Sequence, residues 1–189
     1  MELLLVLALI LLLVVIAYPS LDAMSGDLKL ASAADQVRAA WTQARTRAVN
    51  EARPYRFALV PGKGNYRLAP DAPEFWAGDG SQPTDATVET TERPLVLEQH
   101  LAKGVRFNMQ DASTPVELDP GDDSFLPPGS VELSRYLPIV TFFPDGTSRE
   151  DVSIVFSLKG ARPLLLRLRG ITGAVTVRPL DELVPEGQP

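Results

Sequence analysis

The sequence predicts an α+β protein in which one long N-terminal helix packs on an antiparallel, β-sandwich-like head. Two observations support this fold class. Residues 1–52 join an apolar run to a segment with helical periodicity, and residues 53–180 alternate short β-prone runs with proline- and glycine-rich turns. With 189 residues, the chain is long enough for one core of ordinary size plus an appendage.

The chain divides into four expected regions. Residues 1–26 form a hydrophobic helix, partly transmembrane, and residues 27–52 continue it as an amphipathic helix. Residues 53–180 form the β-rich head, and residues 181–189 form a flexible acidic tail.

The first segment places Glu2 ahead of fifteen unbroken apolar residues, Leu3 to Ala17. A secretory signal peptide would need a positive start, but Met1-Glu2 is negative. A transmembrane helix of residues 3–18 would reach roughly 24 Å, which is short for an apolar layer of about 30 Å but workable with mismatch. A third interpretation is a helix that enters the membrane and is later buried among copies of itself.

The third interpretation explains why an acidic residue precedes the apolar run. In a bundle of such helices, a carboxylate near one N-terminus can neutralise the α-amino group of a neighbour, so both charges leave the lipid together. The segment "ELLLVLALI" from Glu2, with Pro19 seventeen residues after the glutamate, resembles the N-terminal helix of type IV pilins and type II secretion pseudopilins. The resemblance implies an assembly role for Glu2 and places in the assembly helix for Leu3, Leu4, Leu5, Val6, Leu7 and Pro19.

The resemblance also implies how the N-terminus is made. In that family, prepilin peptidase removes a basic leader, and the glutamate is the fifth residue of the mature chain, which is methylated on its amine. Glu2 would then lie three residues closer to the start than the family pattern requires. We therefore expect Met1 to be a misassigned start or an artificial boundary of the chain.

The second half of the helix shows an apolar stripe at spacings of 4, 3, 4, 3 and 4. Arg53-Pro54 ends the pattern, because a residue before proline is disfavoured in the α region. Pro19 and Gly26 are candidate kinks, and Trp41 is expected in the core rather than in a ligand site. The stripe consists of Leu30, Ala34, Val37, Trp41, Ala44 and Ala48.

The head is predicted to contain nine short strands. Residues 61–65 are expected to form a hairpin turn and residues 144–146 a second turn, whereas residues 70–93 and 111–138 are expected to be irregular acidic insertions. The predicted strands are Tyr55–Val60, Tyr66–Ala69, Leu95–Glu98, Val105–Asn108, Val116–Leu118, Ile139–Phe143, Val152–Leu158, Leu164–Arg169 and Ala174–Arg178.

Three sequence stretches narrow the resemblance. The stretch "DQVRAAWTQARTRAVNEARPYRFALV" leads from the helix into the first strand, and "VTFFPDGTS" and "GITGAVTVR" follow near the end. Together they resemble the GspH/FimT group of minor pseudopilins. The resemblance implies a non-enzymatic structural component of a type II secretion or type IV pilus-like machine. It also implies a single-pass bacterial inner-membrane protein with its head in the periplasm. The implied partners are other pseudopilins, prepilin peptidase and the inner-membrane components of the secretion system.

Catalytic and metal chemistry is not expected. The chain has no cysteine and one histidine, His100, which excludes thiol nucleophiles and cysteine-based metal sites and disfavours a Ser-His-Asp triad. Asp119, Asp122 and Asp123 are weak calcium candidates, but their spacing does not fit an EF-hand loop. We interpret them as an exposed acidic loop and expect no cofactor.

A basic C-terminal stretch supports an alternative function. Although the net charge is −6, residues 153–178 contain five basic residues and no acidic ones. They suggest a FimT-like component that binds DNA during uptake. DNA-binding relatives are thought to use a Gly-Arg-x-Arg motif, whereas residues 173–176 read Gly-Ala-Val-Thr, so DNA is not the expected partner. A membrane-tethered β-domain without a filament is the third hypothesis. The basic residues are Lys159, Arg162, Arg167, Arg169 and Arg178.

Overall fold

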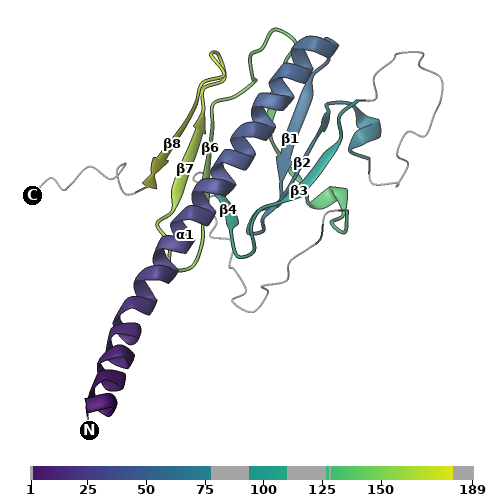
Figure 1. Cartoon of the computed structure of the whole chain (residues 1–189). Helices are drawn as coiled ribbons and strands as arrows, with labels where there is room; N and C mark the ends of the chain where they lie inside the picture. The colour runs from purple at the N-terminus through teal and green to yellow at the C-terminus, as the bar shows by residue number, and fades with distance from the viewer. Residues whose placement is uncertain (1, 78–93, 110–126, 128, 181–189) are drawn as a thin grey trace, which may run out of the picture.

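The chain begins with one long helix that projects from a β-rich head (Figure 1). The computed structural model describes residues 2–77, 94–109, 127 and 129–180, with the backbone alone for residues 2–5 and 8–24. Helix α1 spans Glu2–Glu51 and passes through Pro19 and Gly26 without a break, so neither residue divides it. Its end just before Arg53-Pro54 confirms the prediction, and Ala52 there takes a left-handed φ of 51°.

The described strands form two four-stranded sheets, and every pairing between them is antiparallel. The α+β class is therefore confirmed. The first sheet has the order β3-β2-β1-β5, with β1 Tyr55–Leu59, β2 Asn65–Pro70, β3 Leu97–His100 and β5 Leu137–Phe142. The second has the order β4-β6-β7-β8, with β4 Arg106–Met109, β6 Val152–Ser157, β7 Leu164–Leu168 and β8 Val175–Pro179. Two short 3₁₀ helices, η1 Pro73–Phe75 and η2 Leu133–Arg135, lie in the connections.

One hydrophobic core joins the helix to both sheets. The helix contacts β1 and β5 of the first sheet and β6 and β7 of the second. An edge-to-face contact of 5.8 Å between the rings of Trp41 and Phe57 starts a chain of aromatic rings. The chain continues through Tyr66 and Phe107 to Phe156, with centroid distances of 5.4, 6.3 and 5.5 Å. It therefore runs from the helix through the first sheet into the second.

The β1–β2 turn links the two sheets. The hairpin turn predicted at residues 61–65 spans residues 61–64, because β2 already begins at Asn65, and β1 pairs with β2 from Leu59–Tyr66 onward. The Gly62 N–H donates to the Phe107 carbonyl at 3.0 Å, and the Phe107 N–H donates to the Lys63 carbonyl at 2.9 Å. This turn of the first sheet therefore pairs with β4 of the second.

Several predicted strand boundaries need correction, and hydrogen bonds explain two of them. The strand expected at Leu95–Glu98 begins at Leu97, because the Leu95 N–H donates instead to the Tyr55 hydroxyl at 3.1 Å. The strand expected to include Arg169 ends at Leu168. Arg169 closes the following turn, since its N–H donates to the Ala174 carbonyl and its carbonyl accepts from the Gly173 N–H.

The insertions are only partly described. Of the segments expected to be irregular, residues 73–75 and 133–135 form 3₁₀ turns, and β5 begins at Leu137, two residues before its predicted start. The strand predicted at residues 116–118 and the tail predicted at residues 181–189 lie outside the described residues.

Candidate functional site

Helix α1 divides into a packed part and a projecting part. The whole predicted stripe is buried, with exposed fractions of 0% for Leu30, Val37, Ala44 and Ala48 and 1% for Ala34 and Trp41. The packed part begins at Gly26, where an added Cβ would lie 2.9 Å from Cβ of Ala161 in the β6–β7 loop. The α1 segment before residue 25 projects away from the head (Figure 1).

The projecting part carries the residues assigned to assembly from the sequence. Glu2 is the first residue of α1 and lies at the end farthest from the head (Figure 1). The side chains of Val6 and Leu7 are 54% and 53% exposed, so within the single chain they have surface available for a partner. Leu3, Leu4, Leu5 and Pro19 are helical, as predicted.

Membrane insertion of this helix stays a prediction. Within the part of the chain whose side chains are described, no helix has an apolar stretch long enough to cross a bilayer.

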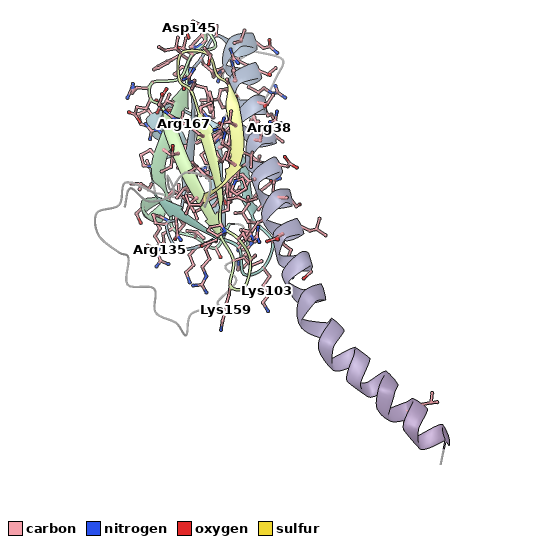
Figure 2. All side chains as sticks on the ribbon, turned by 90° about the vertical axis from the view of Figure 1, so that its left-hand side faces the viewer. Arg38, Lys103, Arg135, Asp145, Lys159 and Arg167 are labelled. Carbon is pink, nitrogen blue, oxygen red and sulfur yellow. The ribbon has the colours of Figure 1, made fainter. Side chains whose placement is uncertain are left out.

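The outward face of the packed part is polar. It forms a shallow open groove whose lining includes Asp35, Arg38, Thr42, Gln43 and Thr46, and Figure 2 labels Arg38 on this part of the helix. The Thr42 hydroxyl donates to the Arg38 carbonyl and the Thr46 hydroxyl to the Thr42 carbonyl, both at 2.9 Å. These hydroxyls bond to their own helix, and the described residues that line the groove include no histidine or cysteine.

The five basic residues proposed for DNA binding are spread over the head. Lys159 and Arg162 lie in the β6–β7 loop at the end of the head where α1 leaves it, whereas Arg167 lies higher on β7 (Figure 2). Arg169 lies in the β7–β8 turn, seven residues after Arg162, which corresponds to roughly 20 Å of extended chain. Arg178 belongs to edge strand β8. The guanidinium of Arg167 lies 4.0 Å from the Asp151 carboxylate.

The calcium candidates Asp119, Asp122 and Asp123 lie outside the described residues. Among the residues that are described, no group of three or more histidine or acidic side chains is placed to hold a metal ion.

Sequence reasoning missed an arginine that joins the helix to two turns. An added Cβ at Gly173 would lie 2.4 Å from Nη1 of Arg45, and one at Gly146 would lie 3.4 Å from its Nε. Arg45 therefore reaches from α1 to the β5–β6 and β7–β8 turns. The sequence shows the glycines as turn signals, but no local pattern indicates that one arginine contacts both.

The outer face of the first sheet holds a second missed cluster around Trp76. The guanidinium carbons of Arg56 and Arg67 lie 5.1 and 5.6 Å from the centre of its indole ring. Arg56 pairs with Asp71 and Arg67 with Glu98. Burial lowers the pKa of Arg67, and burial raises the pKa of the nearby Tyr136 hydroxyl. The cationic side chains are paired within the fold, which indicates a structural role.

His100 makes stability depend on pH. Burial lowers the pKa of His100 below its usual 6.5, so the fold favours the neutral ring. The unfolded chain binds the proton more readily, and this contribution to stability is complete above about pH 6.5 and decreases as the pH falls below that value. We expect urea unfolding to show a wild-type stability that drops between pH 7 and pH 5 more than that of His100→Gln. Parallel pH profiles for the two proteins would contradict this.

Comparisons of the chain with profiles of known protein families, with curated proteins and with solved structures found no match.

Proposed function

We propose that this chain is a structural minor pseudopilin of the GspH/FimT type. It would be anchored in the bacterial inner membrane and assembled into a short periplasmic filament that helps to export proteins. Its head would be the sandwich-like periplasmic domain of such a subunit, and it would use no cofactor and catalyse no reaction.

The division of α1 carries the proposal. From Gly26 to Glu51 the helix is held by the head through an almost completely buried stripe. From Glu2 to about residue 24 it continues away from the head, with a sequence of apolar residues that begins at Leu3. A helix of this composition needs lipid or other helices around it, because its apolar surface is costly in water. Exchanging lipid for neighbouring helices is the transition that assembly of a pilin-like filament requires.

Glu2 would set the register of that assembly. Little apolar area is gained when a helix moves from lipid to a bundle, so packing and charge pairing decide where it stops. Glu2 is the first residue of the helix, and in an assembled filament its carboxylate would meet the α-amino group of a neighbouring chain.

The test is Glu2→Ala in the native host. We expect normal amounts of protein in the membrane fraction, because the apolar run is unchanged. We expect about tenfold or greater loss of filament incorporation, because truncating one member of a desolvated charge pair leaves the other unpaired. Incorporation is measured by crosslinking to neighbouring subunits in the membrane.

Two further variants make the test specific. Glu2→Gln keeps the size of the side chain and should fail like Glu2→Ala. Asp22→Ala removes another acid from the same helix and should assemble normally. Normal filament recovery with both Glu2 variants would rule out the assembly role assigned to this residue.

A further inference from the structure

The end of the head from which the projecting helix emerges is built from three segments that are distant in sequence. Gly26 of α1 packs against Ala161 and Leu158 of the β6–β7 loop, and the Arg162 N–H donates to the Asp27 carboxylate at 3.1 Å. An added Cβ at Gly104, in the β3–β4 turn, would lie 2.9 Å from Leu158. The β3–β4 turn and the β6–β7 loop therefore meet beside the helix at the point where it leaves the head.

These three segments bring four exposed basic side chains to one end of the head. Lys103 and Lys159 lie near each other there, while Asp145 marks the opposite end (Figure 2). Within the described part of the chain, none of the four cations has a carboxylate within ion-pair distance. The nearby Asp27 carboxylate accepts a hydrogen bond from the backbone N–H of Arg162. We call this set the basal patch: Lys29, Lys103, Lys159 and Arg162.

We propose that the basal patch docks on the anionic phospholipid headgroups of the membrane in which α1 is anchored. The inference rests on the proposed function, because it needs the apolar run in a bilayer. The run ends at Ala17, and nine helical residues from there to Gly26 span about 13 Å. The headgroup layer on one side of a bilayer is roughly 5–7 Å thick. The patch would then lie within about one Debye length of the headgroup charges at physiological salt.

The position of the patch favours lipid over nucleic acid. A membrane that holds the helix must face the end of the head from which the helix emerges, so the patch needs no further movement to reach it. A duplex would need an extended basic track, but Arg167 lies higher on β7 and Arg169 lies in the β7–β8 turn, away from the patch. Docking would hold the head against the membrane surface before assembly. Extraction of the subunit into a filament would break this contact.

The chain lacks cysteine, so a single introduced cysteine can carry a spin label that reports the contact between the head and the lipid headgroups. A spin label on Ala102→Cys, an exposed position beside Lys103, reports collisions with nickel-chelating lipids in the headgroup layer. The full chain is reconstituted in phosphatidylcholine vesicles with and without phosphatidylglycerol. We expect frequent collisions only with phosphatidylglycerol at about 0.1 M salt, and their loss at about 1 M salt, where the Debye length falls to about 3 Å.

Charge reversal tests whether the basal-patch lysines make the contact with the headgroups. Lys103→Glu with Lys159→Glu should lower the ratio of docked to undocked heads about 20-fold or more, since each basic residue near an anionic surface contributes about fivefold. The matched control is Arg149→Glu with Arg169→Glu, which reverses two exposed charges in turns at the opposite end of the head and should leave the ratio unchanged.

Three other outcomes would contradict the membrane docking of the basal patch, the membrane anchor or the choice of lipid over nucleic acid. Stable incorporation into both kinds of vesicle, with the label equally remote from the headgroups, would disprove the basal patch and leave the anchor intact. Failure to incorporate into either vesicle would disprove the anchor of the proposed function as well. A salt-sensitive shift of duplex DNA that is lost in the lysine double variant, without headgroup contact, would assign the patch to nucleic acid.

Discussion

Trp41→Ala is expected to lower the free energy of unfolding by about 3–5 kcal/mol, the usual cost of truncating a large buried aromatic side chain. Trp41 is 1% exposed and makes the edge-to-face contact with Phe57 that connects α1 to the aromatic chain of the head. The loss would be a large part of a typical domain stability of about 5–15 kcal/mol. Urea unfolding of the detergent-solubilised full chain, followed by circular dichroism, measures it.

Two variants separate packing from other effects. The indole Nε1 of Trp41 is buried and has no hydrogen-bond partner among the described residues, so Trp41→Phe removes an unsatisfied donor along with part of the ring. We expect it to cost less than half as much as Trp41→Ala. Thr46→Ala, on the exposed face of the same helix, should change stability by no more than about 0.5 kcal/mol. If Trp41→Ala also lowered the free energy of unfolding by only about 0.5 kcal/mol, packing of Trp41 against the head would not hold the helix in place.

Arg67→Met is expected to destabilise the head by about 2–4 kcal/mol, because it leaves Glu98 without its partner. The side chains of Arg67 and Glu98 are only 12% and 18% exposed, so water compensates poorly for the lost pair. The guanidinium also donates to the Phe75 carbonyl at 3.1 Å and lies over Trp76. Its removal therefore weakens the attachment of η1 to the first sheet.

A double variant tests whether the pair or the packing carries this effect. Replacing both members by apolar residues, as in Arg67→Met with Glu98→Leu, should recover most of the loss, since buried ion pairs are often replaceable without cost. Chemical unfolding of the two single variants and the double variant gives the coupling energy. A double variant as unstable as the sum of the single variants would mean that the charges act independently.

Local sequence patterns determined several elements of this protein. The stripe from Leu30 to Ala48 specified a helix and its buried face, because a period of 3.6 residues places these side chains on one side. Arg53-Pro54 specified its end, and the glycine- and proline-rich residues 61–64 specified the first hairpin. Each of these signals acts over a few residues, so it can be read without knowledge of the rest of the chain.

Tertiary structure alone decided which distant segments meet. β1 pairs with β5 as well as with its hairpin neighbour, and the β1–β2 turn pairs with β4. Arg45 reaches Gly146 and Gly173, and the turn with Lys103 meets the loop with Lys159 near Gly26. These contacts depend on closing long loops and fitting side chains in three dimensions, and no periodicity in the sequence encodes them. The apolar helix and Glu2 were therefore visible in the sequence, whereas the basal patch exists only because folding joins three separate segments.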